Sequence, residues 1–214
     1  MKLFSEMRTS TQAISLFAVV CAAVIAITQV STEEKIADNE REFRAKALYE
    51  IVPREQIDNQ LLEDTFEIQL FELGHQAPVT AYRARKDGVV KTVIIPVTAP
   101  DGYSGNIHMI VGINADASVA GVRVLAHKET PGLGDKVETK KSDWILSFNG
   151  KSKVDGQYWG VQKDGGRFDQ FTGATITPRA VVNAVGRALD YFTANRIALL
   201  EVKPVENPNQ EVTN

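Results

Sequence analysis

An uninterrupted apolar segment near the N-terminus constrains this chain more than any other feature. From Ala13 to Val30 no residue is charged, and most positions hold Ala, Val, Ile, Leu or Phe. As an α-helix this segment would rise about 27 Å, close to the roughly 30 Å hydrocarbon core of a bilayer. The segment therefore predicts a transmembrane helix over residues 13–30, and a chain that spans a membrane once.

The charges on either side of this segment predict its orientation. Lys2 and Arg8 precede it, and an acidic group follows it, made of Glu33, Glu34, Asp38, Glu40 and Glu42. The positive-inside rule then places residues 1–12 in the cytoplasm and the remainder outside it, which in a bacterium means an inner-membrane protein with a periplasmic domain. A cleaved signal peptide ending near Val24-Ile25-Ala26 is the alternative, although the apolar run is longer than a usual signal core. Under both interpretations the remainder of the chain is exported from the cytoplasm.

Composition leaves room for one ordinary globular domain beyond the anchor. The chain has 214 residues, 43% of them hydrophobic and 24% charged, with a formal net charge of -3. This near balance gives no reason to expect a nucleic-acid partner. Cys21 is the only cysteine, which excludes an intrachain disulfide and a cysteine-bound iron–sulfur centre. His75, His108 and His127 lack metal-ligand spacing, and no dinucleotide fingerprint is present, so we expect no metal site and no catalytic acid, base or nucleophile.

Hydrophobic periodicity predicts an α+β domain over residues 54–200. A helical stalk is expected over 31–53, ended by Pro53, and a disordered tail over 201–214. Between them we expect an antiparallel or mixed sheet packed by helices. The predicted strands are 79–85, 89–97, 106–114 and 119–126, and the predicted helices are a short one near 144–148 and a long one over 178–196. The charged residues between 135 and 143 are interpreted as a solvated face.

The chemistry is carried by the segment Asp169-Gln-Phe-Thr-Gly-Ala-Thr-Ile-Thr-Pro178. Thr177 is a good N-cap and Pro178 suits the first helical position, so Thr175 would lie two residues before a helix N-terminus. Such an end presents unpaired N–H groups, and Gly173 and Ala174 let a ligand approach the backbone. The residues thus describe a phosphate site with a hydroxyl beside it. The plain alternative is an ordinary helix cap.

Read as a whole, Asp169-x-x-Thr172-Gly173-Ala174-Thr175 resembles the acceptor motif of bacterial flavin transferases. These enzymes take FMN from FAD, with Mg²⁺, and join its phosphate to the last threonine of the motif. The resemblance implies a phosphoester-linked FMN on Thr175. It also implies that the transferase recognises Asp169, Gly173, Ala174 and Thr175.

Two further segments are similar to parts of the same FMN-binding domain. Residues 129–134 match a Glu-Thr-Pro-Gly-Leu-Gly loop, in which Pro-Gly suits a tight turn with a positive φ at the glycine. Gly102-Tyr103-Ser104-Gly105 is a weaker match, and a plain loop is the alternative there. Together the resemblance implies that the flavin is surrounded by Tyr103, Ser104, Thr130, Gly132, Leu133, Gly134, Thr172, Gly173, Ala174 and Thr177.

The order of anchor, stalk, sheet and motifs resembles the G subunits of Rnf-type (Rsx) electron-transport complexes. The resemblance implies an electron-carrying subunit, inactive alone, in a membrane complex that couples ferredoxin and NAD chemistry to ion movement. Its implied partners are other membrane and peripheral subunits, and the flavin transferase during maturation. Alternatives left open are the C subunit of a sodium-pumping NADH:quinone oxidoreductase, a reversible flavin-binding module, an assembly subunit with an empty site and a stand-alone exported flavin enzyme.

Overall fold

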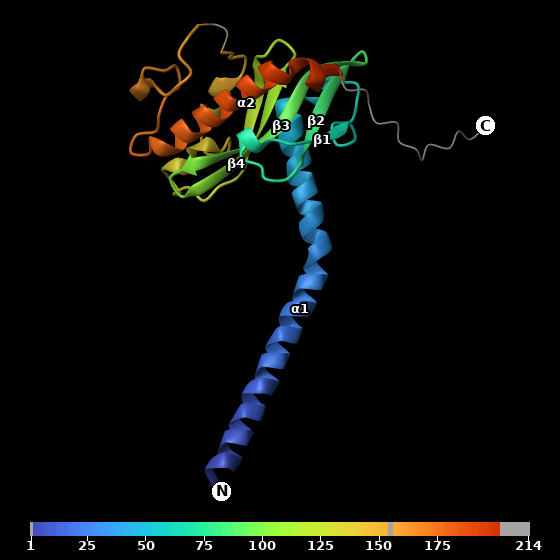
Figure 1. Cartoon of the computed structure of the whole chain (residues 1–214), viewed down its shortest axis with the longest axis vertical. Helices are drawn as coiled ribbons and strands as arrows, with labels where there is room; N and C mark the ends of the chain where they lie inside the picture. The colour runs from blue at the N-terminus through green and yellow to red at the C-terminus, as the bar shows by residue number, and fades with distance from the viewer. Residues whose placement is uncertain (1, 154–155, 202–214) are drawn as a thin grey trace, which may run out of the picture. The chain divides into compact units, whose positions relative to one another are not determined.

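The computed structural model describes residues 2–153 and 156–201, without the side chains of residues 2–10, 12, 13 and 201. The chain forms two compact units, Met1–Arg44 and Ala45–Asn214. Helix α1 (Lys2–Ile51) supplies the first unit, and its last two turns belong to the second (Figure 1). The predicted boundaries at residues 12, 30, 53 and 200 remain predictions about domain organisation.

The first unit contains a helix long and apolar enough to cross a membrane. The described stretch Ile14–Ile51 has a mean hydropathy of 2.3 in its most apolar window, and none of that window is buried. Hydroxyls in this stretch bond back along the helix: Thr28 Oγ1 donates to the Val24 carbonyl at 2.8 Å, and Ser31 Oγ to the Ile27 carbonyl at 2.7 Å. These bonds give the hydroxyls of Thr28 and Ser31 partners within the helix itself. By its length and composition this helix could span a membrane.

The second unit is built on a five-stranded antiparallel sheet in the order β1-β2-β3-β4-β5. The strands are β1 (Thr65–Ile68), β2 (Val79–Lys86), β3 (Val89–Gly102), β4 (Gly105–Asn114) and β5 (Val119–Ala126). The four predicted strands are confirmed, while β1 was not predicted, because four residues are too short to show a period. Asp87 and Gly88 form the β2–β3 turn with φ values of 54° and 72°, as Asp-Gly hairpins require.

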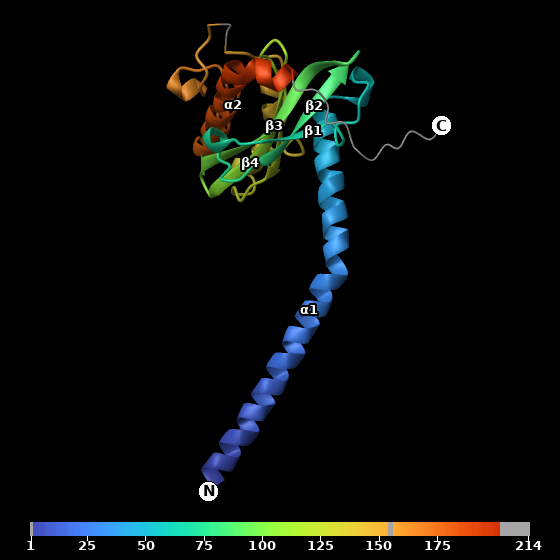
Figure 2. The same ribbon diagram turned by 45° about the vertical axis from the view of Figure 1, so that its right-hand side comes forward.

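Helix α2 (Ile176–Glu201) lies across one face of this sheet, as both Figure 1 and Figure 2 show. Alternate residues of β4 point toward it, since Ile107, Met109, Val111 and Ile113 are all buried in the larger core cluster. The apolar side chains of the helix belong to the same cluster, namely Val181, Val182, Val185, Ala188, Leu189 and Phe192. The apolar residues at every second position of β4 thus pack against the apolar face of α2, which repeats every 3.6 residues, in one core.

The other face of the sheet is covered by the end of α1. Leu48 and Ile51 are buried in a second cluster that includes Ile94 and Ile110 of the central strands. Gly112 and Gly121 are paired across β4 and β5 and leave room for Ile51, since a Cβ on Gly112 would lie 2.4 Å from Ile51 Cγ2. Tight packing of this kind leaves no space for a side chain at that point.

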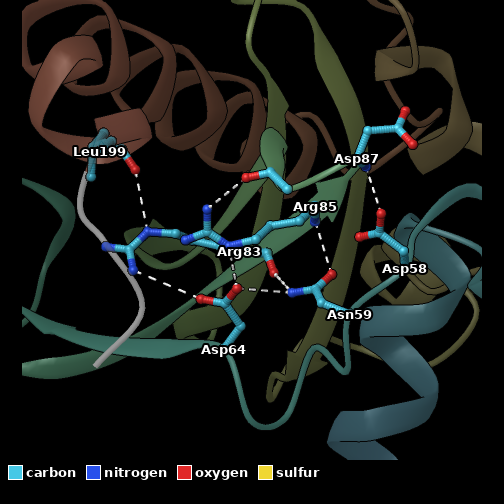
Figure 3. Close-up of polar contacts among 8 residues, drawn as sticks. Asp58, Asn59, Asp64, Arg83, Arg85, Asp87 and Leu199 are labelled. Atoms are coloured by element: carbon cyan, nitrogen blue, oxygen red, sulfur yellow. Dashed lines mark hydrogen bonds and ion pairs between the residues drawn. The ribbon is translucent and has the colours of Figure 1, made fainter. Parts of the chain in front are cut away.

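A buried ion cluster closes the edge of the sheet at β1 and β2 (Figure 3). Arg83 is 1% exposed, its Nε donates to the Leu199 carbonyl at 3.4 Å, and its guanidinium lies 3.8 Å from the Phe66 ring centroid. Asp64 lies 3.8 Å from Arg83 Nη1 and accepts from Arg85 Nε at 2.5 Å. Burial lowers the pKa of the Arg83 guanidinium, and the Asp64 charge opposes that shift. The cluster therefore joins the start of β1 to the last turn of α2.

Three predictions about local structure need correction. The short helix is a 3-10 helix over Asp143–Phe148, and α2 begins at Ile176 and reaches Glu201. Asp135 is buried, 6% exposed, so residues 135–143 are not a uniformly solvated face. The first difference arises because tertiary packing, and not local capping, decides where a short helix starts and how it winds. The predicted disorder after residue 201 falls outside the described residues.

Candidate functional site

A cavity of about 330 Å³ lies where the β3–β4 turn, the loop after β5 and the start of α2 meet. Its volume falls in the range of about 300–1,000 Å³ that small-molecule sites occupy. Residues from all three motifs of the sequence line it, namely Tyr103, Glu129, Thr130, Leu133, Gly134, Gly173, Ala174, Thr175, Ile176 and Thr177. The fold thus brings together segments that are up to 74 positions apart, from Tyr103 to Thr177.

Two glycine turns form one wall of this cavity. Thr130 to Leu133 is a turn in which the Leu133 N–H donates to the Thr130 carbonyl at 3.1 Å and Gly132 has a φ of 77°. Phe171 to Ala174 is a second turn. The Ala174 N–H donates to the Phe171 carbonyl at 3.1 Å, and Gly173 has a φ of 81°. Positive φ at the third turn position selects glycine, so the tight turn predicted at Pro131-Gly132 is confirmed.

Thr175 is the last residue before α2. The Arg179 N–H donates to its carbonyl at 3.3 Å, so Thr175 and not Thr177 occupies the N-cap position, which corrects the predicted cap. Thr175 is half-buried and lines the cavity. Thr175 therefore directly precedes Ile176 and Thr177, whose N–H groups belong to the first turn of a helix and have no intrahelical partners. Pro178, third in the helix, costs no hydrogen bond there.

The three threonines of the acceptor segment have different surroundings. Thr172 is exposed and does not line the cavity, whereas Thr177 is 1% exposed and its hydroxyl donates to the Glu129 carboxylate. Thr175 is the one of the three that is both accessible and within the cavity. The motif distinguished Thr175 from the other two by its register, whereas the burial of Thr177 depends on its contact with Glu129 and was not predicted.

Exposed apolar side chains surround the cavity. Tyr103 is 69% exposed, Leu133 43% and Ile176 45%. Apolar surface of this kind beside convergent polar groups is typical of sites that hold a planar ring with a polar end. A flavin with a phosphate tail has both parts, so the residues present fit FMN.

Some predicted site residues lie apart from this lining. Ser104, Gly132 and Thr172 are near it in sequence but are not among the lining residues. Asp169 is exposed, and its carbonyl accepts from Trp144 Nε1 at 2.8 Å. Arg179 forms a two-bond ion pair with Asp164, at 2.7 and 2.8 Å, which lowers the pKa of that carboxyl and directs the guanidinium to Asp164.

Trp144 and Trp159 belong to an aromatic cluster behind the acceptor segment. Trp144 packs edge-on against Phe171 at a centroid distance of 5.0 Å and against Phe148 at 5.4 Å. Trp159 donates from Nε1 to the Val182 carbonyl at 2.8 Å. Trp144 therefore packs on the segment before Thr175 and Trp159 bonds to α2, and neither lines the cavity.

Glu129 was missed as a site residue. It is 4% exposed, lines the cavity and accepts hydrogen bonds from the N–H groups of Tyr103, at 3.3 Å, and Ser104, at 2.9 Å. The signal that could have revealed it is a carboxylate in a loop of otherwise small or apolar residues. The described residues hold no group of three or more His, Cys, Asp or Glu side chains that could bind a metal.

Comparison with known proteins gives two family matches. Residues 102–190 match the family described as FMN-binding domain, and residues 1–51 match the RnfG N-terminal region. The first match contains the whole cavity lining, and the second contains α1.

Three proteins that are similar to this chain over most of its length share one name: each is the G subunit of an ion-translocating oxidoreductase complex. The one from Pseudomonas aeruginosa (strain UCBPP-PA14) is 51% identical over 192 residues, covering 87% of this chain and 89% of that protein. Its counterpart in Pseudoalteromonas atlantica is 46% identical, with coverage of 87% and 88%. The one in Vibrio atlanticus is 44% identical, with coverage of 87% and 90%.

Proposed function

Because this chain belongs to the family of G subunits of ion-translocating oxidoreductase complexes, we propose that its cavity holds an FMN esterified to Thr175. The chain is an electron-carrying, FMN-binding subunit of such a complex, with one membrane helix and no independent activity expected. The observation that carries the attachment proposal is the position of Thr175. It is the accessible threonine of the acceptor segment, at the N-terminus of α2 and within the cavity.

The chemistry of attachment follows from this position. A flavin transferase with bound Mg²⁺ would use FAD as donor, so that a bond forms between Thr175 Oγ1 and the FMN phosphorus. The pyrophosphate bond breaks, AMP leaves, and the threonine proton is lost. The N–H groups of Ile176 and Thr177 and the dipole of α2 would stabilise the remaining phosphate charge. Asp169, Gly173 and Ala174 are the proposed recognition residues beside Thr175.

When bound, FMN supplies the electron transfer, and the protein supplies binding and orientation. Tyr103, Leu133 and Ile176 offer apolar contact to the ring. Thr130 and Gly134 line the same wall, and the turn glycines leave the backbone open to close approach. Thr175 is an attachment point, with no role as acid or base during turnover. The partners proposed for electron exchange are other subunits of the complex, and the domain is proposed to face the periplasm.

The proposal is tested by flavin fluorescence on a denaturing gel. The full chain is exported in cells that contain the flavin transferase, beside Thr175→Ala and Thr175→Ser. We expect a fluorescent wild-type band, a dark alanine variant and a fluorescent serine variant, because serine keeps the hydroxyl. Mass spectrometry should find FMN less one water on the peptide that contains Thr175.

The alternatives give different results in this experiment. A reversible flavin-binding module would release its flavin on denaturation, and an empty assembly subunit would never carry one. In either case the wild-type band would be dark in cells shown to modify another acceptor protein, and the covalent proposal would fail. The shared name of the relatives favours the G subunit over the C subunit of a sodium-pumping oxidoreductase.

A further inference from the structure

The attachment chemistry gives no role to Glu129, although this buried acid lies in the cavity wall. It is 4% exposed, and burial of a carboxylate is costly unless hydrogen-bond donors surround it. Here the donors come from two other segments: Tyr103 and Ser104 in the β3–β4 turn, and the Thr177 hydroxyl in the first turn of α2. One side chain thus connects all three segments that form the cavity.

The backbone of Glu129 is fixed in turn by His127. The Glu129 N–H donates to His127 Nδ1 at 3.0 Å, and His127 Nε2 lies 2.7 Å from Glu138 Oε1. Because Nδ1 accepts a hydrogen bond, the ring proton is on Nε2 and is donated to Glu138. We call these residues the Glu129 network: Tyr103, Ser104, His127, Glu129, Glu138 and Thr177.

Two glycines show how closely the chain packs around the Glu129 side chain. A Cβ on Gly134 would lie 2.8 Å from Glu129 Cβ and 2.9 Å from Thr177 Oγ1. A Cβ on Gly102 would lie 2.9 Å from Glu129 Oε1. Neither position has space for a side chain beside Glu129, so the chain packs closely around this residue.

We propose that Glu129 is a positioning residue that sets the place of Thr175 for flavin attachment. Glu129 acts through Thr177, which lies two residues after Thr175 in the first turn of α2. The bond between Glu129 and Thr177 holds this helical turn against the β3–β4 turn. The inference rests on the proposed function. The inference extends that function, because it makes the position of the attachment threonine depend on Glu129, a residue that does not itself receive the flavin.

The test compares variants at both ends of the bond between Glu129 and Thr177. Thr177→Val keeps the shape of the side chain and removes its hydroxyl, Thr177→Ser restores the hydroxyl, and Glu129→Gln removes the charge. Asp64→Asn is the matched control, since it also neutralises a partly buried, hydrogen-bonded carboxylate but lies outside the cavity lining. All are full-length chains, incubated with FAD, Mg²⁺ and limiting transferase at a temperature where each is folded.

The first readout is the initial rate of gel-resolved flavin attachment. We expect Thr177→Val and Glu129→Gln to be slower by about tenfold, the factor that loss of one charge-assisted hydrogen bond corresponds to. Thr177→Ser should regain most of the lost attachment rate, and Asp64→Asn should react at the wild-type rate. The double variant Glu129→Gln with Thr177→Val should be no slower than the slower single variant, because both changes act on the same contact.

The second readout needs no flavin. Hydrogen exchange of the Ser104 N–H in the unmodified chain should accelerate in Glu129→Gln and not in Asp64→Asn. Wild-type attachment rates in Thr177→Val and Glu129→Gln would overturn the inference, as would a loss that Asp64→Asn shares. A wild-type chain that stays dark would instead overturn the proposed function, and this inference with it.

Discussion

At the scale of single residues, the sequence motif marks Thr175 as the predicted attachment residue, but it did not predict the different surroundings of Thr172 and Thr177. The motif identifies Thr175 by its register with Asp169 and Gly173. Thr177 was predicted as a helix cap, but its hydroxyl donates to Glu129, which lies 48 residues earlier in the chain. A local pattern contains no information about such a distant partner, so the contact between Glu129 and Thr177 was not predicted either.

His75 gives a prediction of pH dependence at this scale. Burial lowers its pKa from 6.5, with proximity to His108 acting in the same direction and a hydrogen bond to the backbone of Pro96 opposing it. Between the lowered folded value and 6.5 the unfolded chain binds more protons than the folded one, so stability rises with pH in that window. Folding should therefore weaken as the pH falls below about 6.5 and be insensitive to this group above it.

Urea unfolding of the chain in detergent at pH 5 and pH 7 measures this effect. The change in midpoint between the two pH values should be smaller in His75→Gln than in the wild type, because glutamine does not titrate. Equal changes in the two proteins would show that His75 does not contribute.

At the scale of elements, the apolar residues of β4 alternate in the sequence, and the structure buries them in one cluster with the apolar residues of α2. The alternation did not predict what covers the opposite face. Ile94 and Ile110 point there, and the last turns of α1 pack on them. The residues expected as a stalk thus supply part of the domain core, since period alone does not say which helix covers which face.

The contact between Ile51 and the glycine pair of β4 and β5 gives a prediction for this element. Gly112→Ala places a methyl 2.4 Å from the present position of Ile51 Cγ2 and should lower the free energy of unfolding by about 1–3 kcal/mol through overpacking. Ile51→Ala should cost about 2–5 kcal/mol by leaving a cavity.

The double variant tests whether the methyl added at residue 112 occupies the space that the Ile51 side chain leaves. If they do, Gly112→Ala with Ile51→Ala should be more stable than Ile51→Ala alone, because the new methyl fills part of the cavity. Strictly additive losses in denaturant unfolding would contradict the packing described here.

At the scale of the whole molecule, the buried Arg83 joins parts of the second unit that are far apart in the sequence. Its Nη2 has no hydrogen-bond partner among the described residues, and Asp64 supplies the nearby opposite charge. Asp64→Ala should cost about 3–5 kcal/mol, because it leaves a buried charge without compensation. Arg83→Met should cost less, since an apolar chain of similar length fills the same space.

Adding Arg83→Met to Asp64→Ala should therefore restore stability, which thermal unfolding of the three variants measures. A double variant less stable than Asp64→Ala would show that Arg83 contributes more through the Leu199 carbonyl and the Phe66 ring than its burial costs.

The orientation of the chain in the membrane is a second prediction at this scale. With Cys21 replaced by alanine, a cysteine at exposed Lys140 should react with a membrane-impermeant maleimide in spheroplasts, and a cysteine at Ser10 should not. The reverse labelling pattern would place the flavin domain in the cytoplasm and exclude the proposed export.

The sequence by itself determined the features that depend on neighbouring residues. These are the apolar length of the membrane helix, the alternation of β4, the glycine turn at Gly132 and the acceptor motif that ends at Thr175. Each is a local pattern whose physical cause lies within a few positions of the chain.

Only the tertiary structure decided how these parts form a site. It places Tyr103, Leu133 and Ile176 around one cavity, directs Arg179 to Asp164 and buries Glu129 against Thr177. It also begins α2 two residues earlier than its cap residues predicted. Burial and long-range hydrogen bonds produce these features, and their energies depend on pairs of residues that a local pattern does not connect.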